Sequence, residues 1–207
     1  EGDRFALVLW DHGGGPVGGV CWDETFDMDH LTLEELVSAL EESPFADEKL
    51  SWVGFDACLM SSVEVASALA PYAEYMIASQ ETEPAKGWNY AFLSDLHQDA
   101  DGSATGRRII DGYFNSLGDT GEILTMACVD LSKISAVTKQ MDAFFQPISE
   151  QLDTDVFARL SGLRMASTSF GRAIRGISSD SYDLVDLNDL IVNYSDGETP
   201  LSAALND

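Results

Sequence analysis

Short apolar runs alternate with amphipathic helical patterns along most of this chain, and that alternation restricts its fold more than any other feature. Residues 5–10 (FALVLW) are too few for a helix, and the continuous apolar run predicts a strand buried on both faces of a sheet. Residues 50–55 (LSWVGF) and 75–78 (YMIA) predict two more strands, and a fourth is expected within 122–131. Strands that alternate with helices favour a mostly parallel sheet with helices on both faces, so we expect an α/β fold of three layers.

The segments between the expected strands carry helix signals. Thr32 and Glu35 form the T-x-x-E pattern of a capping box, and apolar residues follow at helical spacing. Further helical patterns occupy 59–75, 107–117, 134–152, 157–167 and 183–194. Residues 98–106 (QDADGSATG) are expected to form a flexible connection.

The charge balance limits the partners of the chain. There are 11 basic and 36 acidic residues, and the formal net charge of -25 repels nucleic acid and anionic membrane surfaces. No apolar run approaches the length of a membrane span, so no membrane insertion is expected. Cys21, Cys58 and Cys128 have irregular spacings that fit neither a disulfide framework nor a zinc site. We therefore expect cationic or neutral partners and no metal in the site.

One histidine and one cysteine follow neighbouring strands in this scheme. A strand, helix, strand unit brings the carboxyl ends of both strands to one edge of the sheet, so His12 and Cys58 are expected to face each other there. Cys58 is expected at a helix amino terminus, whose dipole lowers the pKa of the thiol. The three glycines at 13–15 have no side chains, so a substrate can approach this backbone closely. The Gly13 N–H can then join the Cys58 N–H at a developing oxyanion. From spacing alone, a satisfied structural histidine and a buried cysteine remain an equal alternative.

Several segments resemble the clostripain family of cysteine peptidases. The motifs are LVLWDHGGG at 7–15, LTLEEL at 31–36, GFDACLMSSVEVASAL at 54–69 and ASQETEPAKGW at 78–88. The likeness is close over residues 5–90 and looser beyond, through VDLSKI and YDLVDL. It implies a caspase-like three-layer sandwich, shared with caspases, legumains and gingipains, as a single peptidase domain over 1–207. That fold places strands before the histidine strand, and only four residues precede Phe5, so we expect N-terminal strands of the full fold to be missing.

The resemblance also implies roles for individual residues. His12 is the implied general acid and base, Cys58 the nucleophile, and the Gly13 and Cys58 N–H groups the oxyanion donors. Asp56 is implied in the pocket for the residue before the scissile bond. Two residues apart on a strand, Asp56 and Cys58 project to the same face, and an acid there pairs with arginine or lysine. In the loop ETEPAKGW, Glu83 and Lys86 are assigned to substrate binding as well.

Lys86 leaves the specificity open. Family members with strict basic specificity offer a small or acidic residue at this place, and a lysine ammonium near Asp56 would neutralise the pocket. We predict a cysteine endopeptidase with a Cys-His dyad that cleaves after Arg or Lys. The alternatives are a peptidase with a neutral or non-basic pocket and a catalytically silent binding or scaffold module. A third and weaker alternative is an acyl transferase or ligase that forms the same acyl-enzyme.

The expected partner is a peptide or protein substrate. The chemistry requires no cofactor, although the resemblance to calcium-responsive relatives and the acidic surplus leave room for a bound calcium ion. We expect a bacterial protein that is secreted or associated with the cell envelope. The sequence carries no signal for that location, since its first residues, EGDRF, are not a basic-then-apolar segment.

Overall fold

The computed structural model describes residues 4–96, 100–118, 121, 123–171 and 184–206. The chain divides into two compact units, Glu1–Ser132 and Lys133–Asp207. The expectation of a single domain stays a prediction.

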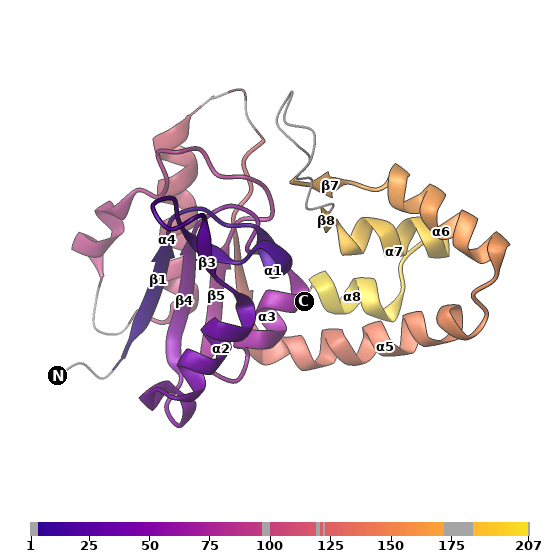
Figure 1. The fold of residues 1–207 in the computed structure, drawn as a ribbon, viewed down its shortest axis with the longest axis horizontal. Helices are drawn as coiled ribbons and strands as arrows, with labels where there is room; N and C mark the ends of the chain where they lie inside the picture. The colour runs from indigo at the N-terminus through magenta and orange to yellow at the C-terminus, as the bar shows by residue number, and fades with distance from the viewer. Residues whose placement is uncertain (1–3, 97–99, 119–120, 122, 172–183, 207) are drawn as a thin grey trace. The chain divides into compact units, whose positions relative to one another are not determined.

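The first unit is built on a four-stranded sheet with the order β1-β4-β5-β6 (Figure 1). Its strands are β1 (Ala6–Trp10), β4 (Leu50–Asp56), β5 (Ala73–Ala78) and β6 (Ala127–Asp130). The pairs β1-β4 and β4-β5 are parallel, and only β6 is antiparallel to its neighbour. The predicted mostly parallel sheet is therefore confirmed, with the carboxyl ends of three strands at one edge.

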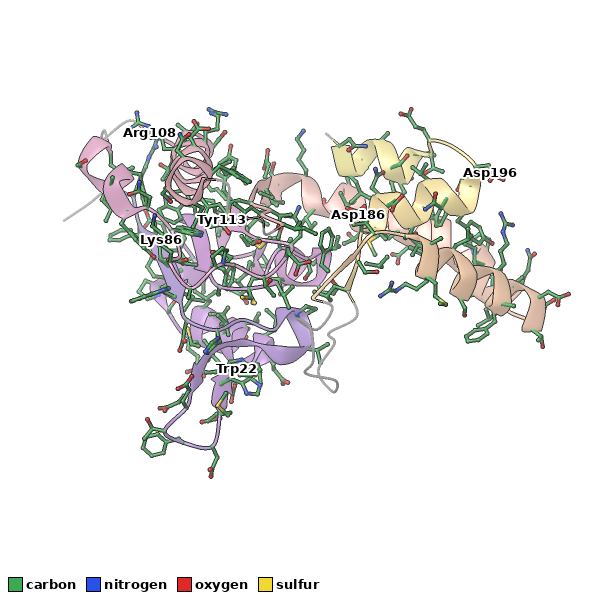
Figure 2. All side chains as sticks on the ribbon, turned by 90° about the horizontal axis from the view of Figure 1, so that it is seen from above. Trp22, Lys86, Arg108, Tyr113, Asp186 and Asp196 are labelled. Carbon is green, nitrogen blue, oxygen red and sulfur yellow. The ribbon has the colours of Figure 1, made fainter. Side chains whose placement is uncertain are left out.

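Helices cover both faces of this sheet (Figures 1 and 2). On one face lie α4 (Gly102–Leu117) and the short helix η2 (Tyr90–Asp95), and on the other lie α2 (Leu33–Glu41) and α3 (Val63–Leu69). The α4 face buries a cluster of large side chains, formed by Trp52, Ile77, Trp88, Phe92, Ile109 and Tyr113. Because side chains alternate along a strand, Val53 and Phe55 point to the opposite face, where both are fully buried. The predicted three layers are confirmed.

The connections carry the smaller elements of the first unit. After β1 come α1 (Gly15–Gly18) and an antiparallel hairpin of β2 (Val20–Asp23) and β3 (Asp29–Leu31). The expected capping box is present, because Thr32 Oγ1 accepts from the Glu35 N–H while the Glu35 carboxylate accepts from the Thr32 N–H. The 3-10 turn η1 (Pro44–Ala46) leads into β4, and η3 (Leu131–Lys133) follows β6.

The second unit is helical. It contains α5 (Ile134–Glu150), α6 (Thr154–Ala166), α7 (Leu187–Ser195) and α8 (Pro200–Asn206). A two-stranded antiparallel ladder of β7 (Ser169–Phe170) and β8 (Leu184–Val185) joins them. Ile191 and Leu201 are fully buried, and the Arg159 guanidinium stacks 4.6 Å from the centre of the Tyr194 ring. Tyr182 and Asp183 of the YDLVDL motif lie outside the described residues.

Several expectations are overturned. The expected helix 59–75 is shortened to α3, with residues 73–75 in β5, and residues 184–185 of the expected helix 183–194 form β8. In the described sheet β1 is an edge strand with an exposed Trp10, preceded by a half-exposed Phe5, and is not buried on both faces. Residues 102–106 are the first turns of α4, with Asp101 as the N-cap through its bond from the Ala104 N–H. No helix among the described residues is both long enough and apolar enough to cross a bilayer.

Candidate active site

The loops that carry His12 and Cys58 leave the same edge of the sheet. Trp10 pairs with Asp56 at the carboxyl ends of the parallel strands β1 and β4. His12 and Cys58 each lie two residues beyond that pair. The structure thus brings the two predicted residues to one edge, at the carboxyl ends of neighbouring parallel strands, where open α/β sheets bind their ligands.

Gly13 packs directly on the backbone of Cys58. A Cβ atom at Gly13 would overlap the Cys58 carbonyl oxygen and would lie 3.1 Å from the Cys58 nitrogen and from the Ala57 Cβ. No other residue has a side chain small enough for this approach. The glycine therefore lets the histidine loop touch the cysteine turn.

Where these segments meet, two backbone N–H groups have no acceptor among the residues that the structure describes. The bridge between Gly13 and Val20 uses the Gly14 N–H and the Cys21 N–H, which bond to the carbonyls of Gly19 and His12. Neither Gly13 nor Cys58 donates its own N–H to another residue in the described part of the chain. An unpaired pair of donors at a glycine and a candidate nucleophile suits the binding of an oxyanion.

The His12 ring contacts the β2-β3 hairpin. Its Nε2 lies 3.4 Å from a carboxylate oxygen of Glu24, and its ring centre is 6.3 Å from that of Trp22. The His12 side chain is 58% exposed, and it forms no hydrogen bond with Cys58 in this structure. The pairing with Glu24 was not predicted from the sequence, because 12 residues and a turn separate the two.

Cys58 lies in the turn after β4, with its sulfur on the backbone of Glu83. The sulfur accepts from the Glu83 N–H at 3.2 Å, and the thiol donates to the Glu83 carbonyl at 3.8 Å. The next residue, Leu59, has a φ of +66°, in the left-handed region that non-glycine residues rarely occupy. This turn redirects the chain immediately after the candidate nucleophile.

The pKa of the Cys58 thiol is raised. Burial is the main cause, the Glu83 N–H opposes it, and the Glu83 carboxyl group adds to it when it is ionised. The expected lowering by a helix dipole is wrong, because α3 begins only at Val63, with Ser62 as its N-cap. The dipole acts within the first turn, and Cys58 lies before that turn.

Asp56 is buried, and protein donors satisfy its carboxylate. Oδ1 accepts from the Trp88 N–H at 3.1 Å, and Oδ2 accepts from the Tyr90 hydroxyl at 2.8 Å. Gly87, at a φ of +62°, passes so close that a Cβ atom there would lie 2.7 Å from Oδ1. Asp56 therefore faces the loop 79–90, as Cys58 does, but its carboxylate is covered by that loop.

The side chains of Glu83 and Lys86 lie in different surroundings. The Glu83 carboxyl group is buried beside Asp56, and its pKa is raised to about 9, mainly by burial and next by the charge of Asp56. The exposed Lys86 ammonium instead donates to the Ser116 carbonyl at 2.7 Å, near the end of α4. In Figure 2 Lys86 lies on the side of the sheet where α4 is, and Trp22 lies on the opposite side. The Glu83 carboxyl group therefore lies beside Asp56, whereas the Lys86 ammonium lies at the Ser116 carbonyl.

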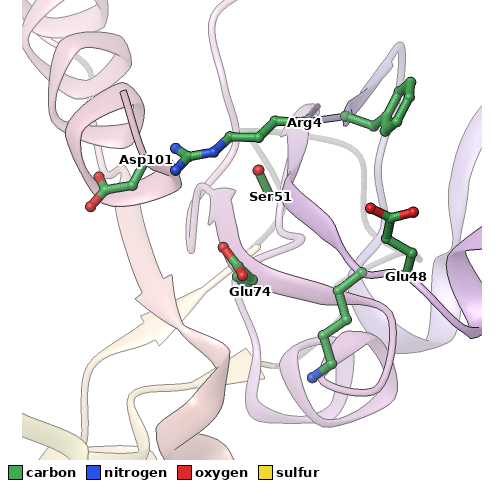
Figure 3. Close-up of a pocket in the computed structure, with 7 residues that line it drawn as sticks. Arg4, Glu48, Ser51, Glu74 and Asp101 are labelled. Atoms are coloured by element: carbon green, nitrogen blue, oxygen red, sulfur yellow. The ribbon is translucent and has the colours of Figure 1, made fainter. Parts of the chain in front are cut away.

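A hollow of about 350 Å³ opens at the other end of the strands (Figure 3). Phe5 precedes β1, Lys49 precedes β4 and Glu74 lies near the start of β5, so the hollow is at the amino ends of these strands. It is not the candidate site, because His12 and Cys58 follow the carboxyl ends. Among the described residues no group of three or more His, Cys, Asp and Glu side chains is placed to hold a metal ion.

Comparisons with known proteins identify the family and the fold. The model of the clostripain family matches residues 1–205. A secreted C11 cysteine protease from Bacteroides thetaiotaomicron, solved with an irreversible peptide inhibitor, aligns with a TM-score of 0.67 at 20% identity, over 99% of this chain and 54% of that one. An inactive zymogen C11 protease from Parabacteroides distasonis gives a TM-score of 0.63 at 20% identity, with the same two coverages.

The alignment with a third solved structure covers nearly all of that structure's chain. A clostripain from Bacteroides thetaiotaomicron, in complex with the peptide inhibitor BTN-VLTK-AOMK, has a TM-score of 0.52 at 19% identity, over 89% of this chain and 98% of that one. The search of curated proteins returned no significant match. These likenesses confirm the predicted caspase-like fold class. The chain spans about half the length of the first two structures, at 54% of each.

Proposed function

Because the chain belongs to the clostripain family, we propose that it is a cysteine endopeptidase with Cys58 as nucleophile and His12 as general acid and base. The observation that carries this proposal is the contact of the Gly13 backbone with Cys58, beside two N–H groups that have no acceptor among the described residues. A substrate carbonyl oxygen placed between those donors would put its carbon next to the sulfur.

The reaction proceeds in two steps. The raised pKa keeps Cys58 a thiol at rest, so its proton passes to His12 as the sulfur attacks the peptide carbonyl. The Gly13 and Cys58 N–H groups bind the oxyanion, the C–N bond breaks, and His12 returns the proton to the leaving amine. His12 then takes a proton from the water that attacks the thioester, the C–S bond breaks, and His12 returns that proton to the sulfur as the acid product leaves. The contact of Glu24 with Nε2 orients the His12 ring during these steps.

We propose a basic residue, Arg or Lys, before the scissile bond. The buried Asp56 carboxyl group beside Cys58 supports a cationic partner, and Lys86 bonds to the Ser116 carbonyl instead of to Asp56. The inhibitor bound by one structural neighbour has the sequence VLTK, in which lysine is last. Because residues 87–90 cover Asp56, substrate entry requires this segment to move. One neighbour is described as secreted, and we propose export for this chain as well.

A substrate panel and a labelling reagent test this function. Fluorogenic peptides that differ only in the residue before the bond should be cleaved fastest with Arg or Lys. A lysyl or arginyl acyloxymethyl ketone should modify Cys58 and spare Cys21 and Cys128, as read by peptide mass spectrometry, and Cys58→Ala should abolish both signals. Faster cleavage after neutral or acidic residues would exclude the basic specificity. Equal modification of all three cysteines without turnover would favour the silent binding module.

A further inference from the structure

The Glu83 side chain occupies an unusual place for a carboxyl group. Both of its oxygens are buried, and the polar groups beside them are the Trp88 indole N–H, the Ala57 N–H and the Asp56 carboxyl group, none of which makes a close hydrogen bond to them. The indole N–H of Trp88 is buried without an acceptor at the same geometry. A buried carboxylate with such weak hydrogen bonds is costly, which favours the neutral form of Glu83.

The surroundings of Glu83 make it neutral. The ionisable groups that face it are Asp56 at the end of β4, Cys58 in the following turn and Tyr90 in η2. All of these are acids, and no cation is among the groups that act on it. Two carboxylates cannot bond to each other, but a protonated Glu83 can donate to Asp56. The raised pKa, about 9, agrees with one proton held by this pair.

The backbone of the same residue holds the candidate nucleophile. The Glu83 N–H and carbonyl both bond to the Cys58 sulfur. The loop is tied to the cysteine turn again where the Leu59 N–H donates to the Glu81 carbonyl and the Ser61 N–H donates to the Ser79 carbonyl. The position of the sulfur therefore depends on the position of this loop, and Glu83 lies within the loop with its carboxyl oxygens buried.

We propose that Glu83 is a positioning residue: its side chain anchors the loop 79–90 against Asp56, and its backbone thereby holds the Cys58 sulfur for attack. This inference rests on the proposed function for its catalytic consequence only. While the Asp56–Glu83 pair keeps its proton, the loop stays anchored beside the sulfur. Loss of that proton places a second negative charge next to Cys58, which weakens the anchor and disfavours the thiolate.

Iodoacetamide labelling of Cys58 separates this role from simple packing. The ratio of the Glu83→Gln rate to the wild-type rate should rise at least threefold between pH 7 and pH 9.5, because only the wild type gains a charge beside the sulfur. Glu81→Gln is the matched control, since it removes a carboxyl group two residues away in the same loop. The ratio of the Glu81→Gln labelling rate to the wild-type labelling rate should be the same at both pH values. An equal ratio at both pH values for Glu83→Gln would overturn the proposal.

Turnover gives the second readout. Glu83→Ala should lower kcat at least tenfold with KM within threefold, and Glu83→Gln should recover most of that loss, because it keeps the shape and the neutral charge. A kcat within twofold of the wild type for Glu83→Ala would also overturn the proposal. If Glu83→Ala does not fold, the labelling ratio of Glu83→Gln still decides. If the wild type cleaves no peptide, the proposed function fails, and the labelling ratio remains an independent test of the positioning role.

Discussion

Gly13 lies against the carbonyl group of Cys58 so closely that the added methyl group of alanine would overlap the Cys58 oxygen. The contact joins the loop of the candidate acid and base to the turn of the candidate nucleophile. It also fixes the distance between the two N–H groups that we assign to the oxyanion. The proposed oxyanion site therefore depends on the absence of a side chain at position 13.

Gly13→Ala should lower kcat/KM by about 100-fold, because the methyl group displaces a donor of the oxyanion site. Peptide hydrolysis measures the effect, and circular dichroism establishes that the variant is folded. Gly162→Ala is the matched control, since no atom lies within 4 Å of a Cβ at this position in α6. The control should raise stability by up to about 1 kcal/mol and keep the wild-type rate. More than a third of the wild-type rate in Gly13→Ala would contradict the assignment.

Glu83→Gln should change how stability depends on pH. The ordinary pKa of this carboxyl group is 4.5, and folding raises it to about 9. Between those values the folded protein holds one more proton than the unfolded chain, so the free energy of unfolding of the wild type falls as pH rises. Glutamine has no proton to lose. The free energy of unfolding of Glu83→Gln minus that of the wild type should therefore rise by at least about 2 kcal/mol from pH 6 to pH 8.5.

Thermal and urea unfolding at several pH values measure this gap. Glu48→Gln is the control, because Glu48 is exposed, and its difference from the wild type should stay constant over the same range. A constant gap for Glu83→Gln would show that the buried carboxyl group keeps its charge in the folded protein.

Asp56→Asn and Lys86→Ala should affect specificity unequally. Asp56 supplies a negative charge beside Cys58, so its loss should lower the ratio of kcat/KM for arginine to that for norleucine at least tenfold. Lys86 bonds to the Ser116 carbonyl, so its loss should change this ratio less than threefold. A larger rise in the ratio for Lys86→Ala would show that its ammonium acts on the pocket, as the alternative with a neutral pocket requires.

Thr32→Ala should destabilise the first unit by about 1 kcal/mol, because it removes the N-cap of α2 and one half of the capping box. The exposed Ser38, in the middle of the same helix, provides the control. Ser38→Ala should be neutral or stabilise by up to about 0.5 kcal/mol. Chemical unfolding measures both, and equal midpoints for the two variants would contradict the role of the cap.

The start of α4 shows why part of the fold could not be predicted. Residues 98–106 resemble a loop because glycine, serine and aspartate are frequent there. In the structure, a Cβ on Gly102 would overlap the Tyr75 ring, and one on Gly106 would overlap the Cys128 sulfur. These glycines serve the close packing of a helix on β5 and β6. Composition alone does not distinguish that use of glycine from flexibility, because the contact involves residues 20 or more positions away.

The sequence by itself determined the features that depend on neighbours along the chain. These are the apolar strands, the capping box at Thr32, the mostly parallel sheet, and the arrival of His12 and Cys58 at one edge, since strand order and handedness follow from local rules. Only the tertiary structure decided what surrounds those residues. Burial raises the pKa of Cys58 where its place before a helix suggested the opposite, and Lys86 turns to Ser116, away from Asp56. Solvation and charge depend on every atom packed around a group, and distant parts of the chain supply most of those atoms.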